Sequence, residues 1–220
     1  TYYFEKGTNV RPTSVVYDRA GSSAATAKRA EFNWPELLAG VDVFYFSGIT
    51  PAVSEDLAGA VEDALVYCRS HSITTVCDLN YRGKMWSREK AQSVMRRLMA
   101  GVDVCIANDE DFEAALGIRA FDGDMSRGIE QIDDFREGME EIRRQFPNCK
   151  TVASVLRNIR SVEDSDWMGI LLKDGKFFES PVHHVQVMEG VAAGDAFGAG
   201  LIHGMLRGMA PQETVDFAIS

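Results

Sequence analysis

Residues 41–46 read Val-Asp-Val-Phe-Tyr-Phe, and similar apolar runs follow at 73–77 (Ile-Thr-Thr-Val-Cys) and 102–106 (Val-Asp-Val-Cys-Ile). Short runs rich in β-branched and aromatic residues are typical of buried strands. The runs start about thirty residues apart, which is the length of a βαβ unit. Successive βαβ units wind with a right hand into a parallel sheet that helices cover on both faces. We therefore predict an α/β fold.

The segments between and after these runs have the three- and four-residue apolar spacing of amphipathic helices. Ser54 and Ser87 stand where the N-caps of the first two helices would lie, because a serine hydroxyl can accept a backbone N–H of the first turn. The expected helices cover 57–68, 91–99, 109–116 and 132–146.

The remainder of the sequence predicts one more core strand and antiparallel strands toward both ends of the chain. A fourth core strand is expected at 151–156, and Asp174-Gly175 is a strong hairpin signal. Residues 1–5 and 14–18 alternate in polarity, which predicts a small antiparallel flap. We expect residues 1–30 to be part of this flap, a lid over a ligand site, and residues 31–220 to form the α/β body. Because the chain opens in a strand-like stretch and closes in a helix-like one, we expect that it is truncated at both ends.

Composition narrows the class of protein. The 220 residues carry a net charge of −10, which disfavours a nucleic-acid partner. None of the four cysteines belongs to a CxxC pair, so buried reduced thiols are expected. His183 and His184 are neighbours in a predicted strand, which directs them to opposite faces and argues against a shared metal site. No apolar run reaches the roughly twenty residues of a membrane helix, so we expect a cytoplasmic protein.

The chemically richest segment is Glu189-Gly-Val-Ala-Ala-Gly-Asp-Ala-Phe-Gly-Ala-Gly-Leu-Ile-His-Gly204. It follows a predicted strand and leads into a helix whose glycines each cost about 1 kcal/mol relative to alanine, as expected where something approaches closely. Small residues at 192–194 let backbone N–H groups face an anion, and the helix dipole favours one there. Asp195 stands at the helix entrance, either as the N-cap or as a base directed at that anion.

Residues 192–200 resemble the G-A-G-D-A-F-x-A-G motif of ribokinase-like (PfkB) sugar kinases. The resemblance implies a ribokinase-like three-layer sandwich with a mainly parallel sheet and a small antiparallel β flap. It also implies that Asp195 is the catalytic base and contacts the substrate. Ala193, Gly194 and Asp195 would form the anion hole for the transferring phosphoryl group, and Gly194 would contact the nucleotide. The family has glycine at position 192, and if φ is positive there, the Cβ of Ala192 costs about 1 kcal/mol or more.

Two further segments follow predicted strands. Asn108-Asp-Glu-Asp111 resembles the family's N-x-x-E stretch, which implies that Asn108 and Asp111 order Mg²⁺ through water; a solvated acidic helix start is the alternative. Asp78-Leu-Asn-Tyr-Arg82, with Trp86, is similar to the 2-keto-3-deoxygluconate kinase subgroup, in which the arginine binds the carboxylate of the sugar acid. The planar guanidinium suits a carboxylate. Alternatively, Arg82 pairs with Asp78 or caps a helix end.

The same subgroup suggests further contacts with the ligands. Tyr2, Tyr17 and Arg19 match flap residues that touch the substrate, and packing on a strand face is the alternative for the tyrosines. Arg157 lies at the end of the fourth core strand, where the family binds nucleotide phosphates.

The resemblance implies an ATP-dependent sugar-acid kinase that phosphorylates the 6-hydroxyl of 2-keto-3-deoxygluconate with ATP and Mg²⁺. It also implies a homo-oligomer formed through the β flap. Another family member, such as a fructokinase, would not need Arg82 for its neutral substrate. A non-catalytic sugar-acid-binding homologue would lack ATP turnover. A dehydrogenase is disfavoured because no dinucleotide fingerprint is present.

Overall fold

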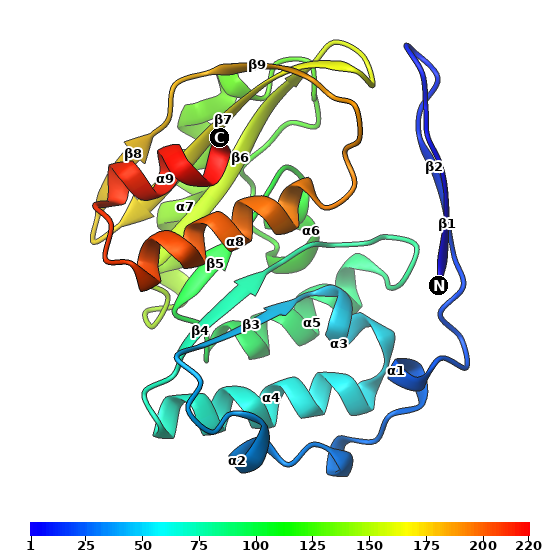
Figure 1. Ribbon diagram of the computed structural model, residues 1–220, viewed down its shortest axis with the longest axis vertical. Coiled ribbons are helices and arrows are strands. Elements are labelled where there is room, and N and C mark those ends of the chain that lie inside the picture. Colours follow the sequence, from blue (N-terminus) through cyan, green and yellow to red (C-terminus); the bar gives the residue numbers. More distant parts are fainter.

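Four parallel strands form the core of the sheet in the computed structural model, which describes residues 1–220. They lie side by side in chain order and all pairs among them are parallel, as the sequence predicts (Figure 1). The strands are β3 (Val43–Ser47), β4 (Thr74–Asp78), β5 (Val104–Ile106) and β6 (Thr151–Ile159).

The sheet continues beyond β6 with antiparallel strands: β7 (Asp164–Lys173), which pairs with β6, and β8 (Lys176–Glu179) and β9 (His183–Gln186), which both pair with β7. Asp174 and Gly175 join β7 to β8 with φ values of 50° and 77°. Positive φ at both turn residues is the geometry of a type I′ hairpin, so this predicted turn is confirmed.

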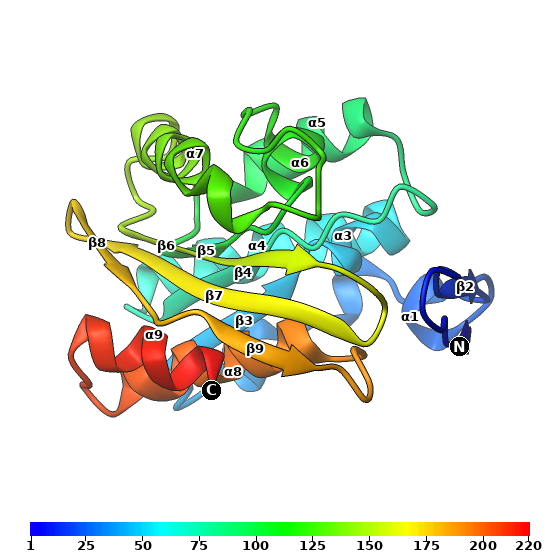
Figure 2. The ribbon, with the colours of Figure 1, turned by 90° about the horizontal axis from the view of Figure 1, so that it is seen from above.

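Helices cover both faces of the sheet and complete the three layers (Figure 2). The larger core lies on the face covered by α4 (Glu55–Ser70), α5 (Arg88–Met99), α6 (Asp111–Leu116) and α7 (Ile132–Gln145). The smaller core lies under α8 (Ala193–Leu206) and α9 (Pro211–Ile219). Shorter helical turns are α1 (Ser23–Thr26), η1 (Arg29–Glu31), α2 (Trp34–Leu37), α3 (Ile49–Val53) and η2 (Ile129–Gln131).

The predicted serine caps are present. The hydroxyl of Ser54 accepts from Leu57 N–H at 3.2 Å, and that of Ser87 accepts from Lys90 N–H at 3.3 Å. Each bond satisfies one backbone donor that the first helical turn would otherwise leave unpaired.

The flap is a separate antiparallel pair, β1 (Tyr2–Glu5) and β2 (Ser14–Tyr17), that runs along one side of the body (Figure 1). Four hydrogen bonds tie it to the body, one of them from Val162 N–H to the carbonyl of Asn9 at 3.2 Å. Lys84 Nζ donates to the carbonyl of Val15 at 2.6 Å, and Asn9 N–H donates to Glu163 Oε2 at 2.9 Å. Lys6 donates to the carbonyl of Met188, in the loop before α8.

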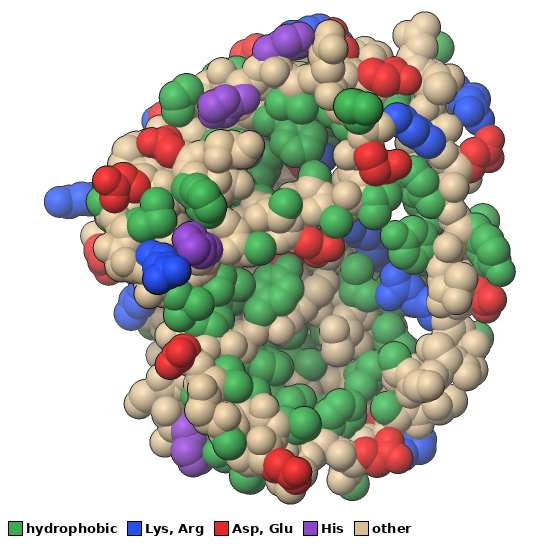
Figure 3. All heavy atoms as spheres, in the orientation of Figure 1, with side chains coloured by type: hydrophobic (Ala, Val, Ile, Leu, Met, Phe, Trp, Pro, Cys, Tyr) green, Lys and Arg blue, Asp and Glu red, His purple; other side chains and the backbone are tan.

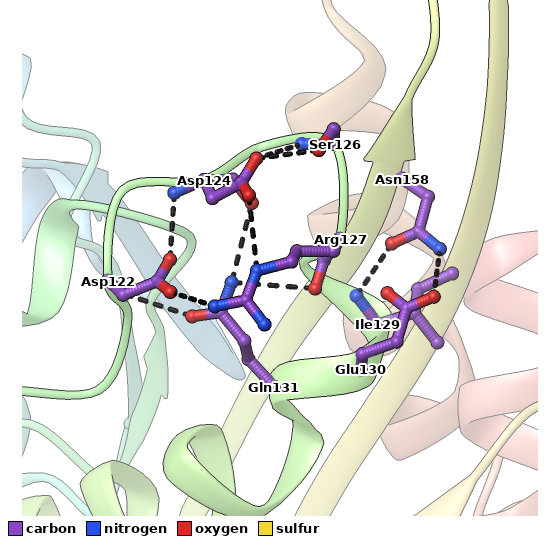
Figure 4. Close-up of polar contacts among 8 residues, drawn as sticks. All are labelled: Asp122, Asp124, Ser126, Arg127, Ile129, Glu130, Gln131 and Asn158. Atoms are coloured by element: carbon purple, nitrogen blue, oxygen red, sulfur yellow. Dashed lines mark hydrogen bonds and ion pairs between the residues drawn. The ribbon is translucent and has the colours of Figure 1, made fainter.

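The loop between α6 and η2 is ordered by its own polar side chains (Figure 4). Asp124 accepts from the backbone N–H and the hydroxyl of Ser126, and Arg127 pairs with both Asp122 and Asp124. Asn158 of β6 accepts from Ile129 N–H at 2.8 Å, which fixes the loop against the end of that strand.

The cysteines are as the sequence predicts. All four cysteines are buried and unpaired. No group of three or more histidine, cysteine or acidic side chains is arranged to hold a metal ion. None of the helices combines the length and the apolar character that a membrane span requires.

Candidate active site

The start of α8 leaves backbone donors free. Ala192 precedes the helix with φ 68°, in the left-handed region, so the φ that makes its Cβ unfavourable is present. The N–H groups of Gly194 and Asp195 have no acceptor in the chain, and Ala193 N–H has only a long 3.4 Å contact with the carbonyl of Gly190. Apart from its chain neighbours and the backbone of its own helix, no atom lies within 4 Å of the point where a Cβ on Gly194 would stand. An accessible set of N–H donors at a helix N-terminus can bind an anion.

The side chain of Asp195 makes no polar contact within the chain. It is exposed and takes part in no hydrogen bond or ion pair. The alternative that Asp195 is the N-cap is wrong, because Ala192 occupies that position and Asp195 is the third helical residue. An unengaged carboxylate therefore stands beside unengaged N–H groups.

Arg82 lies in the loop that follows β4 and is half-buried. Its Nη1 donates to the carbonyl of Tyr81 at 2.8 Å, and no carboxylate lies within ion-pairing distance. The predicted alternative, an ion pair with Asp78, is therefore not formed. The other guanidinium donors remain available for an anionic ligand.

The buried carboxyl of Asp78 interacts electrostatically with both Arg82 and Asp195. Asp78 ends β4 with only 3% of its surface exposed, and burial raises the pKa of its carboxyl to about 6. The charge of Arg82 opposes this rise in pKa, and the charge of Asp195 adds to it. Both residues thus lie close enough to act on Asp78, at the carboxyl edge of the parallel sheet, where such sheets bind ligands.

Asn108 and Asp111 brace the loop between β5 and α6. The two carboxylate oxygens of Asp111 accept from Tyr81 N–H at 2.7 Å and Asn108 N–H at 3.1 Å, and Asn108 Oδ1 accepts from Val155 N–H at 2.8 Å. Burial first, and then the charge of Asp78, raise the pKa of Asp111 to about 7. Both carboxylate oxygens of Asp111 and the amide oxygen of Asn108 thus each accept one backbone N–H.

Arg157 on β6 forms an ion pair with Asp109, and its guanidinium lies 6.0 Å from the centre of the Trp167 ring. Asp109 has φ 37°, so the backbone turns sharply where β5 leads into α6. The pairing places Arg157 next to the Asn108–Asp111 loop.

The predicted flap residues share one environment. Tyr2 and Tyr17 are cross-strand partners with ring centres 6.5 Å apart, and the Arg19 guanidinium lies 4.9 Å from the centre of the Tyr17 ring. They form part of a flap that openings separate from the body along much of its length (Figure 3). The hydrogen bond from Lys84 to Val15 joins this strand to the loop that carries Arg82.

Residues 1–219 match the model of the pfkB family carbohydrate kinases. The chain belongs to this family. It is 32% identical over 214 residues to the 2-dehydro-3-deoxygalactonokinase of Haloferax volcanii, covering 97% of this chain and 59% of that protein.

Solved structures of pfkB relatives share the fold. The 2-dehydro-3-deoxygluconokinase of Thermotoga maritima superposes with a TM-score of 0.90 at 39% identity, over 99% of this chain and 64% of that one. A PfkB family carbohydrate kinase of Listeria grayi gives a TM-score of 0.87 at 31% identity, with coverages of 99% and 64%. The chain thus spans about three fifths of the length of these relatives.

Two side chains near the site of this pfkB kinase chain are not among the predicted site residues. Tyr45 appears in the sequence only as one aromatic residue in an apolar strand, and Asp78 only as a possible partner of Arg82. The sequence feature that could have identified them is a polar group inside or at the end of a buried strand, because such a group requires a hydrogen-bond partner.

Proposed function

We propose that this chain forms the phosphoryl-transfer portion of an ATP-dependent sugar-acid kinase that phosphorylates the 6-hydroxyl of 2-keto-3-deoxygluconate. The observation that carries the proposal is the start of α8. There the carboxylate of Asp195 makes no contact in the chain and stands beside free N–H groups. Transfer of a phosphoryl group to an alcohol requires a base for the hydroxyl proton, here the carboxylate, and donors for the phosphoryl oxygens, here the N–H groups.

In the proposed reaction, Asp195 accepts the proton of the substrate hydroxyl as its oxygen attacks phosphorus. The N–H groups of Gly194 and Asp195, with Ala193, donate to the oxygens of the phosphoryl group, on which charge is spread in the transition state. The positive end of the α8 dipole stabilises the same charge. Proton transfer by such a base contributes about 10² to 10⁴-fold to the rate.

At the other end of the substrate, Arg82 binds the carboxylate. Its free donors can form two parallel hydrogen bonds with a planar anion. Tyr2, Tyr17 and Arg19 would close over the sugar from the flap and exclude water, which would otherwise take the phosphoryl group.

Mg²⁺ bound with ATP supplies neutralisation of the phosphate charges. Asn108 and Asp111 would act on its water ligands, because their side-chain oxygens already accept backbone N–H groups but keep free lone pairs. Arg157 would reach the nucleotide phosphates from β6, in exchange for part of its contact with Asp109.

A second candidate substrate is 2-keto-3-deoxygalactonate. The relative from Haloferax volcanii is described as a 2-dehydro-3-deoxygalactonokinase. The two sugar acids share the carboxylate that Arg82 would bind, so the Arg82 contact supports both equally.

The test is a coupled assay of ADP release by the full-length protein with ATP, Mg²⁺ and a panel of the two sugar acids, fructose and ribose. We expect turnover with at least one sugar acid and a much lower kcat/KM with the neutral sugars. Preference for a neutral sugar would contradict the substrate assignment, and no turnover with any compound would contradict the kinase proposal.

A further inference from the structure

Tyr45 lies between the sheet and the first turns of α8. It stands on β3 and is half-buried. A Cβ added to Gly198 would lie 3.6 Å from Cε2 and 3.7 Å from the hydroxyl oxygen of Tyr45. Gly198 comes three residues after Asp195, and residues with this separation share one face of a helix. The Tyr45 ring therefore packs against the helical turn that carries the proposed base.

The hydroxyl of Tyr45 faces Asp78. Its oxygen lies 3.5 Å from Asp78 Oδ2, at the long end of the hydrogen-bond range. The other carboxylate oxygen of Asp78, Oδ1, is buried and has no hydrogen-bond partner. A carboxylate that is 3% exposed and under-satisfied attracts any donor that can reach it, and the Tyr45 hydroxyl is the side-chain donor present, beside the backbone N–H of Asn80.

Titratable groups from several elements act on Asp78. Arg82 acts from the loop after β4, Asp111 from α6, Asp195 from α8 and Tyr45 from β3. Burial, followed by the charges of Asp78 and Asp195, raises the pKa of Tyr45 far above its ordinary value, so its hydroxyl keeps its proton and remains a donor. Asp78 thus interacts electrostatically with the group that would bind the carboxylate and with the group that would accept the proton, and Tyr45 contacts Asp78 directly.

We propose that Tyr45, held by Asp78, is a positioning residue that sets the place of the α8 turn bearing Asp195 relative to Arg82. Its hydroxyl fixes the ring on the sheet side, and the ring supports the glycine face of the helix. This role rests on the proposed function, because Asp195 and Arg82 have catalytic and binding roles only if the protein is a sugar-acid kinase.

The kinetic test uses Tyr45→Phe in the full-length protein, which keeps the ring and removes the hydroxyl. We expect kcat for the sugar acid to fall about 3- to 10-fold, the size of one net hydrogen bond, while KM changes little because Arg82 keeps its charge. In the double variant Asp78→Asn/Tyr45→Phe, the fall in kcat should be smaller than the product of the two single falls, because both residues act through one contact. Tyr67→Phe, a half-buried tyrosine of α4 that stacks on His71, is the matched control and should change nothing.

A second test needs no substrate and separates this inference from the proposed function. By NMR, the amide resonances of Gly194 and Asp195 should move in Tyr45→Phe and not in Tyr67→Phe. The carboxyl of Asp78 should titrate at a higher pH in Tyr45→Phe, because the tyrosine hydroxyl lowers the pKa of that carboxyl. Unmoved amide resonances or an unchanged Asp78 titration would overturn the positioning role, as would an unchanged kcat. A wild-type protein that releases no ADP would instead overturn the proposed function.

Discussion

At the scale of single residues, Ala192 carries a side chain where the backbone is left-handed, with φ 68°. A Cβ in this region costs about 1–2 kcal/mol, whereas glycine adopts it freely but loses more entropy on folding. We expect Ala192→Gly to raise the free energy of unfolding by about 0–1 kcal/mol and to leave kcat equal or higher. Urea unfolding and the ADP-release assay measure both quantities. A clear fall in kcat would show that this turn does not form the anion hole.

Arg82 offers a test of substrate recognition. Arg82→Lys keeps the charge but loses the planar pair of donors, so binding of the carboxylate weakens equally in the ground and transition states. A charge-assisted hydrogen bond contributes about 1.5–3 kcal/mol, and we expect KM for the sugar acid to rise roughly 10- to 150-fold with a smaller change in kcat. Fructose is the control. Equal losses for fructose and the sugar acid would contradict a contact between Arg82 and the carboxylate.

Asp78 makes the stability of the protein depend on pH. Its pKa is raised from 3.8 to about 6 in the folded state, so the stability gained by its protonated form is complete below about pH 4 and lost as pH rises through 6. The ionised, buried carboxylate then lowers the free energy of unfolding by on the order of 3 kcal/mol, and an asparagine avoids this loss. We expect Asp78→Asn to gain stability relative to wild type between pH 5 and pH 8 in urea unfolding.

The control for this comparison is Asp134→Asn, on the exposed side of α7. It should give the same difference from wild type at both pH values. A difference for Asp78→Asn that is also independent of pH would show that Asp78 is ionised without cost in the folded protein.

At the scale of elements, the features that were predicted correctly are those with local causes. Ser54 and Ser87 cap helices through bonds to residues three positions ahead, and Asp174-Gly175 forms its turn from its own backbone preferences. β6 continues to Ile159, beyond its predicted end at residue 156, because its partner β7 pairs with it as far as Ser165. That extension depends on a neighbouring strand, which apolar periodicity does not describe.

The polar contacts around the site could not be predicted for the same reason. Asp109 and Arg157 are 48 residues apart, and Tyr45 and Asp78 are 33 apart. Only the folded sheet brings the ends of their strands together. The segment around Asp195 stands out in the sequence because the proposed base and the N–H groups of the proposed anion hole lie within a few consecutive residues.

The flap supports a prediction about assembly. Cross-strand partners alternate between its two faces, so Tyr3 and Val16 share the outer face, where they are 62% and 60% exposed. Exposed apolar side chains on a thin two-stranded sheet favour burial against another surface, and we propose a second copy of the chain. Val16→Glu should lower the mass measured by analytical ultracentrifugation to that of the monomer. Val66→Glu, at a similarly exposed valine of α4, should leave the mass unchanged, and equal masses for both variants would contradict the flap contact.

At the scale of the whole molecule, the fold brings the two ends of the proposed substrate site together from different layers. The loop at the end of β4 carries Arg82, and α8, which covers one face of the sheet, carries Asp195. Asp78, at the end of β4, lies within electrostatic reach of both. In the proposed reaction, the parallel core would fix the separation between Arg82, which would bind the carboxylate, and Asp195, which would accept the proton, as alignment of the reacting atoms requires.

The most direct test of the proposed kinase function is the turnover of Asp195→Asn. Asparagine has nearly the same shape but cannot accept the proton, and the Asp195 side chain makes no contact that folding would lose. We predict a fall in kcat of about 10² to 10⁴-fold with an unchanged melting curve. Turnover close to that of the wild type, with the same melting curve, would show that Asp195 is not the base.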